Sequence, residues 1–414
     1  MRSPAKGVSE LKLGSRVQIP PSPPFFFSKF INNASVAQLD RASDYGSEGC
    51  GFNSCWVRHF IWLIELIFNC RFVVRSRKMS SIIIPEGYSS RQNIMETEIA
   101  IKLIKDFFEK ELSKELNLTR ISAPLFVKRD TGLNDNLNGV ERPVSFEMKE
   151  AEGEIIEIVH SLAKWKRLAL KRYGVNSGEG IYTDMNAIRR DEDLDNTHSI
   201  YVDQWDWERV IDREDRNIDF LKGIVNKIYS VFKKTEEMLA EKYENYTKFL
   251  PEKVTFVTSQ ELENLYPEIP AGERENRFAK DNGAIFIMQI GKLLESKQRH
   301  DGRAPDYDDW ELNGDLIMWN PVLNSALELS SMGIRVDSES LERQLKALNL
   351  EERKELEYHR MLLNNELPLT IGGGIGQSRI CMFLLQRAHI GEVQASLWSD
   401  EIIAECEKNG INLL

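Results

Sequence analysis

The chain has 414 residues, of which 42% are hydrophobic and 29% charged, a composition typical of a folded protein with a buried core. Its net charge is −11, and residues 79–414 alone carry −17. Such an acidic part repels nucleic-acid phosphates, which excludes non-specific nucleic-acid binding. The five cysteines form neither a disulfide framework nor a paired metal-binding spacing, so a reducing, cytoplasmic compartment is expected.

Residues 1–78 differ from the rest of the chain, with 11 basic and 5 acidic side chains. Their apolar run, 60–74, is shorter than the roughly 20 residues of a membrane-spanning helix, and no signal peptide is expected. Two other stretches resemble translated transfer-RNA genes. We therefore expect the natural chain to start at Met79, with 1–78 a non-native or disordered extension. A membrane-associating extension is the alternative.

An amphipathic helix is predicted over Ile94–Leu116, because apolar residues recur at helical spacing between Lys and Glu side chains. Its apolar stripe consists of Ile94, Ile101, Ile104, Phe108 and Leu112. A strand is predicted at 119–127, where Pro124 indicates an edge or a bend. A loop rich in Asn, Asp and Gly follows, which contains Asp135, and then a hairpin of strands 144–148 and 155–159.

A helix is predicted to begin near His160 and to run to about Tyr173. His160 or Ser161 could cap it, and its first two turns carry Lys164, Lys166 and Arg167. Cations at this end oppose the helix dipole. Two interpretations follow. Either these three cations lie on a solvent-exposed surface, where the unfavourable interaction with the dipole is tolerated, or an anion binds there.

The strand predicted over 198–208 is the element around which the chain is organised. Its β-branched and aromatic residues run at a period of two. One face ends in three polar side chains, those of Gln204, Asp206 and Glu208. Buried carboxylates need partners, so this face predicts the floor of a polar pocket. The alternative is a solvent-facing edge.

Arg189 ends the preceding predicted strand, in the sequence Arg189-x-Asp-Glu192. A short polar loop then leads into the organising strand. In an antiparallel pair, an arginine at this place can project over the polar face of its partner. Its guanidinium could there bind a phosphate with two hydrogen bonds.

The second half of the chain continues the mixture of helices and strands. The pattern predicts helices over 218–239, 259–266 (with Ser259 as cap), 338–364 and 380–385, and strands over 251–256, 282–290, 314–321 and 327–337. Antiparallel runs of strands with segregated helices indicate the α+β class, with an antiparallel β-sheet flanked by helices. No linker interrupts residues 79–414, so a single domain is expected there.

Asp315 and Glu328 are carboxylates within largely apolar predicted strands. Two such groups need a cation between them or an upward pKa shift. Oxygen ligands of this kind suit Mg²⁺ that is held partly through substrate phosphates. Near the end of the chain, the glycines of Gly372–Arg379 would let the backbone approach a ligand closely. This turn is not a dinucleotide fingerprint, and the chain contains no P-loop sequence.

These features resemble a known superfamily. The first helix with Ala123-Pro124, the Arg189 loop and the Gly372–Arg379 turn look like the three signature motifs of class II aminoacyl-tRNA synthetases. Longer strings are more similar to a stand-alone relative, the ammonia-dependent asparagine synthetases or aspartate–ammonia ligases, and these strings are 160–167, 201–209, 303–310, 328–337 and 370–379. The likeness runs from about Ile94 to Trp398 and implies a class II synthetase-like catalytic domain.

The resemblance implies an ATP-dependent synthesis of L-asparagine from L-aspartate and ammonia. The side-chain carboxylate of aspartate would attack the α-phosphate of ATP, giving β-aspartyl-AMP and pyrophosphate. Ammonia would then attack the acyl carbon and expel AMP. Positioning and charge stabilisation would supply most of the catalysis. A homodimer is also implied.

The resemblance further implies roles for residues around the nucleotide. Arg189 would hold the α-phosphate, and Arg379 the adenine face and the distal phosphate. Asp308 would contact ATP or its ribose. The residues that would organise Mg²⁺ and the nucleotide are Asp315, Glu328 and Ser331.

The remaining implied roles concern aspartate and ammonia. Lys166 and Arg335 would pair with the two carboxylates of aspartate, and Ser161 would line the same substrate site. The residues that would bind its amino group and receive ammonium are Asp135, Gln204 and Asp206. Ammonium must lose a proton before it can attack, so a nearby carboxylate is chemically suitable.

Two alternatives remain open. One is a tRNA synthetase for aspartate or asparagine, which would need an anticodon-binding domain and a basic surface. The other is a non-catalytic paralogue, which would usually lose the arginines or the acidic pair. We expect no nucleic-acid partner and no membrane partner. Glutamine is not expected as the nitrogen donor, because the chain has no N-terminal nucleophilic cysteine and no second domain for a glutaminase.

Overall fold

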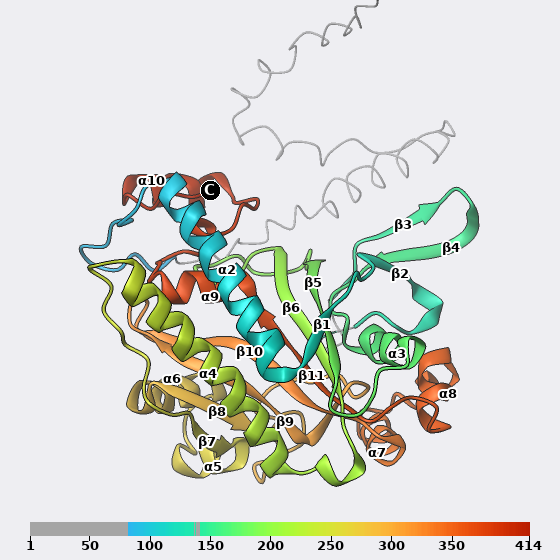
Figure 1. The fold of residues 1–414 in the computed structure, drawn as a ribbon. Coiled ribbons are helices and arrows are strands. Elements are labelled where there is room, and N and C mark those ends of the chain that lie inside the picture. The colour runs from blue at the N-terminus through green and yellow to red at the C-terminus, as the bar shows by residue number, and fades with distance from the viewer. Residues whose placement is uncertain (1–81, 136, 138–140) are drawn as a thin grey trace, which may run out of the picture. The chain divides into compact units, whose positions relative to one another are not determined.

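The computed structural model describes residues 82–135, 137 and 141–414 (Figure 1). All of them belong to one compact unit, which begins at Arg75. The predicted start at Met79 and the predicted extension 1–78 lie outside the described residues. Among the residues described, no helix combines the length and the apolarity needed to cross a membrane.

The centre of the fold is an eight-stranded sheet with the strand order β1-β5-β6-β11-β10-β9-β8-β7. Neighbours are antiparallel except for the outer pairs β1/β5 and β7/β8, which are parallel. In that order, the strands are Leu118–Arg120, Gly180–Ile188, Tyr201–Val210, Thr370–Gly376, Ser325–Arg335, Asp308–Asn320, Ala284–Met288 and Thr255–Thr258. The predicted antiparallel sheet flanked by helices is confirmed.

A second, three-stranded sheet has the order β2-β4-β3, with β2 at Phe126–Lys128, β3 at Ser145–Met148 and β4 at Ala151–Ile158. The predicted hairpin is β3 and β4. The single strand predicted over 119–127 is wrong, because its two ends, β1 and β2, belong to different sheets. Pro124 lies in the connection, and its fixed φ and missing N–H are consistent with this break.

Helices cover both faces of the large sheet. The face that carries the main core is covered by α2 (Ile94–Leu116), α4 (Ile218–Lys242) and α9 (Gln377–Leu384). Figure 1 shows α2 and α4 running across this face. Apart from these three, the helices are α3 (Ala163–Tyr173), α5 (Ser259–Leu265), α6 (Ala271–Asn282), α7 (Ser338–Leu348), α8 (Glu357–Leu363) and α10 (Asp400–Lys408).

The alternation along β6 separates the core from the polar face of the sheet. Trp205 and Trp207 are fully buried in the main core. The ring of Phe108 on α2 stacks on Trp205 at 5.0 Å and meets Phe232 of α4 edge-on at 4.9 Å. Gln204 and Asp206 therefore point to the opposite face. Since β6 lies between β5 and β11, the alternative of a solvent-facing edge strand is wrong.

Helix α2 has the predicted bounds, and a capping box between Asn93 and Glu96 fixes its start. One member of the predicted apolar stripe, Ile94, is wrong, because it is exposed in the first turn. The cap of α5 is Thr258, which accepts a hydrogen bond from the Glu261 N–H, rather than the predicted Ser259. The hydroxyl of Ser259 instead donates to the carbonyl of Gln289.

The region 338–364 is helical as predicted but not continuous. Helix α7 ends at Leu348, the next residue, Asn349, adopts a left-handed conformation (φ 55°), and a 3₁₀ turn, Glu351–Glu355, precedes α8. Helix α6 was not predicted, because its sequence is mostly polar and only Arg274 and Ala279 are buried. Three further 3₁₀ turns lie at Arg129–Thr131, Arg213–Asp215 and Ile390–Glu392.

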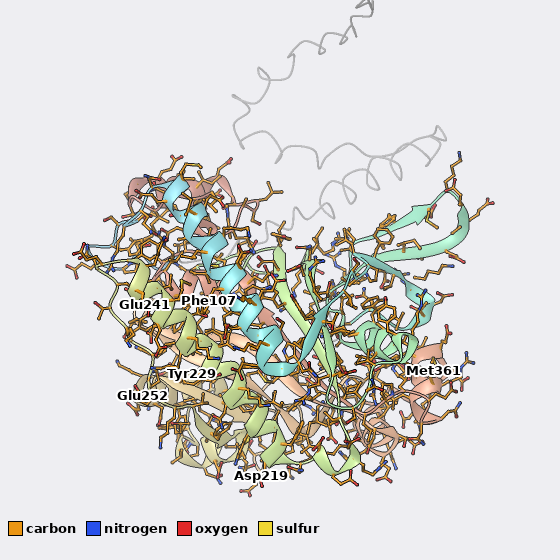
Figure 2. All side chains as sticks on the ribbon, in the orientation of Figure 1. Phe107, Asp219, Tyr229, Glu241, Glu252 and Met361 are labelled. Carbon is orange, nitrogen blue, oxygen red and sulfur yellow. The ribbon has the colours of Figure 1, made fainter. Side chains whose placement is uncertain are left out.

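The packing of Phe108 between α2 and the sheet predicts that removal of its ring strongly destabilises the fold. Phe108→Ala should lower the free energy of unfolding by about 3–5 kcal/mol, because it removes a fully buried ring and leaves a cavity. Phe107→Ala, one position away on the half-buried side of the helix (Figure 2), is the matched control and should cost clearly less. Urea unfolding followed by circular dichroism measures both, and equal losses would contradict the assignment.

Candidate active site

A cavity of about 380 Å³ opens over the polar face of the sheet. Its walls come from β6, β10, β11, the end of β5, the segment before α3 and the loop before β9. The predicted site residues that line it are Asp135, Ser161, Arg189, Gln204, Asp206, Asp308, Glu328, Ser331 and Arg335. Three other predicted residues, Lys166, Asp315 and Arg379, do not line it. The structure thus brings most of the predicted set together.

Arg335 is the centre of a buried ion-pair network below this cavity. Its guanidinium donates to Glu208 (Nη2 to Oε2, 2.7 Å) and to Asp308 (Nη1 to Oδ1, 2.5 Å), and all three side chains are almost fully buried. Burial acts to raise the pKa of Glu208, but Arg335 and Lys166 outweigh it and hold that pKa below its usual value. For Asp308, burial dominates and raises the pKa in spite of Arg335.

Lys166 lies beneath the cavity rather than in its wall. Its fully buried ammonium is 2.5 Å from Asp206 Oδ1 and donates to the backbone carbonyls of Trp207 and Gly373. Burial lowers its pKa. The second oxygen of Asp206 accepts the Leu162 N–H at the start of α3, at 3.0 Å. Asp206 is therefore held at both oxygens, by a cation and by a backbone donor.

The other two cations in the first two turns of α3, Lys164 and Arg167, are also buried. Lys164 pairs with Asp306 at 3.3 Å, and Arg167 donates to the carbonyls of Pro368 and Val336. The interpretation of a wet surface is wrong. The anions that face this part of α3 belong to the protein itself, and carboxylates at a helix start also favour the helix dipole.

The glycines of β11 leave room for the network. A Cβ on Gly372 would collide with the carboxylate of Glu208 and the guanidinium of Arg335, and a Cβ on Gly374 would collide with the amide of Gln204. We predicted that these glycines allow the backbone to approach a ligand. Their observed role also includes close packing against charged side chains of the neighbouring strands.

Arg189 keeps much of its guanidinium available. It follows β5 directly, its side chain is 26% exposed, and its nearest ionic partner is Glu192 at 3.9 Å. Its Nε is buried but has no hydrogen-bond partner among the described residues. It also lines a second, adjoining cavity of about 170 Å³. A strong anion in either cavity would find this donor unused.

The second cavity contains Arg379, which donates to the carbonyl of Glu328 at 3.0 Å and lies 3.8 Å from its carboxylate. The two cavities share wall residues, namely Arg189, Glu192, Gln204, Glu328 and Gly374. They therefore adjoin and can hold two parts of one ligand.

For the carboxylates of Asp315 and Glu328 we predicted either a nearby cation or a raised pKa, and Asp315 shows both. A cation is present, because Arg303 forms an ion pair with Asp315. The pKa of Asp315 is also raised, to about 7, by burial and by Glu328, with Arg303 acting against them. Asp315 Oδ1 has no hydrogen-bond partner among the described residues, and the side chain of Glu328 is 45% exposed.

Comparison with known proteins identifies the family. The sequence model of aspartate–ammonia ligases (AsnA) matches residues 95–410. The chain is 63% identical to the aspartate–ammonia ligase of Ruminiclostridium cellulolyticum over 336 residues, 81% of this chain and all of that one, and 64% identical to that of Fusobacterium nucleatum over 79% of this chain and all of that one.

The chain belongs to the aspartate–ammonia ligase family. Solved structures resemble its fold at lower identity. Asparaginyl-tRNA synthetase from Pyrococcus horikoshii, complexed with asparaginyl-adenylate, has a TM-score of 0.55 at 14% identity, covering 73% of this chain and 70% of that one. That of Entamoeba histolytica has a TM-score of 0.53 at 16% identity, covering 73% and 67%. The predicted family and class II synthetase-like fold are confirmed.

The cavity residues that were not predicted as site residues include His160, Arg303 and Tyr307. Each occurs in one of the strings that carry the family resemblance, 160–167 or 303–310. His160 was interpreted only as a helix cap, but the cap position of α3 is Leu162 and no side chain caps it. Arg303 and Tyr307 belong to the string 303–310, for which the resemblance implied a role only for Asp308.

The Arg335 network predicts a large stability effect. Arg335→Met should lower the free energy of unfolding by about 3–5 kcal/mol, because it leaves Glu208 and Asp308 buried without their cation. The control is Arg343→Met, whose side chain is 56% exposed and pairs with Asp309, and which should cost less than about 1 kcal/mol. Chemical denaturation compares them. A small loss for Arg335→Met would show that the network contributes little.

Proposed function

We propose that residues 79–414 form one catalytic domain that makes L-asparagine from L-aspartate, ammonia and ATP through β-aspartyl-AMP, releasing AMP and pyrophosphate. Family membership supports the overall ligase reaction. The structural observation that carries the chemical scheme is Arg189. Its underused guanidinium lies where a cavity rich in carboxylates meets a second cavity that contains Arg379.

In the first step, Arg189 binds the α-phosphate of ATP and stabilises the charge that develops on it. A guanidinium suits this role because it stays charged and donates two parallel hydrogen bonds. The nucleoside part of ATP occupies the second cavity beside Arg379. Asp308 and Ser331 line the first cavity, where they would contact the nucleotide. The aspartate carboxylate attacks phosphorus, and the bond to pyrophosphate breaks.

Aspartate occupies the first cavity between Arg335 and Gln204. Arg335 offers its guanidinium edge to a substrate carboxylate while Glu208 and Asp308 hold it in place. Gln204 and Ser161 supply neutral hydrogen bonds. Lys166 is a positioning residue, since its ammonium is committed to Asp206 and the backbone below the cavity. This revises the direct contact with aspartate that the resemblance implied.

The carboxylate pair fits Mg²⁺ that is bound mainly through ATP. No group of three or more His, Cys, Asp or Glu able to hold a metal occurs in the described part of the chain. Among the described residues, however, Asp315 Oδ1 is buried without a hydrogen-bond partner, and Glu328 and Ser331 line the cavity. Oxygen ligands in this number are typical of Mg²⁺ shared with phosphates. The ion would neutralise phosphate charge.

In the second step, ammonia attacks the acyl carbon of the adenylate. Ammonium must first lose a proton. Burial raises the pKa of the Asp135 carboxyl, which makes its carboxylate a better proton acceptor than an ordinary one. The C–N bond forms, the C–O bond to the phosphate breaks, and AMP leaves with the electron pair. A second proton leaves the nitrogen and passes to water.

The tRNA synthetase alternative receives less support, since the synthetase structures share only 14–16% identity with this chain, against 58–64% for the ligases. We also propose a homodimer that acts in the cytoplasm. Family resemblance and the low cysteine count support these two points, and native mass measurement with cell fractionation tests them.

Arg189→Ala should abolish aspartate-dependent exchange of pyrophosphate into ATP, because the α-phosphate loses its main donor. The full chain should convert aspartate, ATP and ammonium to asparagine and AMP without tRNA. Arg277→Ala, an exposed arginine paired with Glu273 on α6, is the control and should retain activity. Product formation is measured by chromatography. Normal exchange by Arg189→Ala would refute the role of this residue, and ADP as the product would refute the scheme.

Asp315→Asn should raise the Mg²⁺ concentration needed for half-maximal pyrophosphate exchange by tenfold or more, on the order of 1.4 kcal/mol or more, because it removes a negatively charged ligand. Asp301→Asn is the matched control, since Asp301 pairs with the same Arg303 from an exposed position. It should change the requirement less than about threefold. Equal shifts would mean that Asp315 acts only through Arg303.

A further inference from the structure

His160 lies in the wall of the main cavity, between β4 and α3, and is only 1% exposed. Its backbone N–H donates to Asn134 Oδ1 at 2.9 Å, and its Nδ1 lies 3.1 Å from the carbonyl oxygen of Asp135. A carbonyl oxygen can only accept, so Nδ1 carries the hydrogen. The other ring nitrogen, Nε2, is therefore a bare acceptor.

This Nε2 atom is buried and has no hydrogen-bond partner among the described residues. Buried acceptors in native proteins are nearly always paired, and an exception calls for a reason. Because His160 lines the cavity, a bound molecule can supply the missing donor. That molecule must carry an N–H or O–H group, which excludes the phosphates and ionised carboxylates of the substrates as partners.

The surroundings of His160 narrow the choice of donor. Asp135, on which its ring is anchored, and Asp206 and Gln204 are wall residues of the same cavity. These groups together form a set of acceptors, which suits a small nitrogen with several N–H bonds. Of the proposed substrates, ammonium has four such bonds and no other group to bind. The amino group of aspartate is the competing donor.

We infer that Nε2 of His160 accepts a hydrogen bond from ammonia, and that His160 is an ammonia-binding residue of the second step. This inference rests on the proposed function. The bond orients the nitrogen lone pair toward the acyl carbon by holding one N–H, while the Asp135 carboxylate takes the first proton of ammonium. The proton transfers, the formation of the C–N bond and the departure of AMP are those of the proposed second step.

His160 acts as an acceptor and not as the base. Burial lowers its pKa, and the positive charge of Arg189 acts in the same direction. The imidazole therefore stays neutral at physiological pH, which is the form with a free lone pair on Nε2. An imidazolium would carry a hydrogen on that nitrogen and would repel ammonium.

Two variants distinguish the role of the Nε2 acceptor from that of the Nδ1 hydrogen bond to the Asp135 carbonyl. His160→Asn places an amide where Nδ1 lies, so it can still donate to the Asp135 carbonyl but lacks an acceptor at Nε2. His160→Gln can place its amide oxygen near Nε2 and so keeps the acceptor. His389→Asn is the matched control, because His389 is also fully buried, its Nε2 has no partner among the residues that the structure describes, and it lines neither cavity.

For each full-length variant, three quantities are measured: aspartate-dependent pyrophosphate exchange, the KM for aspartate, and the KM for ammonium in asparagine formation. His160→Asn should raise the ammonium KM about tenfold or more, as expected for one lost hydrogen bond to a charged group. Exchange and the aspartate KM should stay within about threefold. His160→Gln should recover most of the ammonium affinity, and His389→Asn should keep it.

The outcomes distinguish the alternatives. Exchange and amidation that fall together in both His160 variants would show a structural role and overturn the inference. An increase confined to the aspartate KM would assign Nε2 to the amino group of aspartate. An unchanged ammonium KM in His160→Asn would show that Nε2 has no role in ammonia binding. If His160→Asn does not fold, His160→Ala, which also lacks an acceptor at Nε2, takes its place: a raised ammonium KM supports the proposal and an unchanged one overturns it. Absence of exchange in the unmodified chain would instead refute the proposed function.

Discussion

The buried pairing of Arg335 with Glu208, and of Lys166 with Asp206, determines how the site is built. Charges in a protein interior are tolerated only with close partners, because the cost of removing them from water is large. These pairs tie β10 and α3 to one face of β6. The strand between β10 and β6, β11, must then be narrow where they cross, which explains why it is rich in glycine.

A consequence is a division between charges that build the site and groups that remain available to a ligand. Lys166 and Lys164 form ion pairs with buried carboxylates of the protein, and most of the guanidinium of Arg335 is paired in the same way. Within the described part of the chain, Arg189 and His160 each keep a nitrogen atom without a hydrogen-bond partner. The buried pairs fix the backbone and the carboxylates, so the available groups can be aimed without rearrangement when a substrate binds.

The sequence predicted the parts of this arrangement that depend on local pattern. The period of two along β6 separated Trp205 and Trp207 from Gln204 and Asp206, and the structure has that separation. Pairing over long range was harder to predict. Nothing local indicates that Lys166 turns inward to Asp206, or that Pro124 divides one strand between two sheets, since both depend on which distant element packs nearby. His160 was missed because its partner, Asp135, is defined only by the fold.

Gln204 lies at the junction of the two cavities, and its amide is confined by Gly374. On one side, the carboxylate of Asp135 would favour a cation such as ammonium. On the other, Arg189 and Arg379 favour phosphate. A charged residue between them would stabilise one substrate at the expense of the other. A neutral amide can donate to one neighbour and accept from the other, so it suits the place where, in the proposed reaction, the acyl group would lie between ammonia and the phosphate of the adenylate.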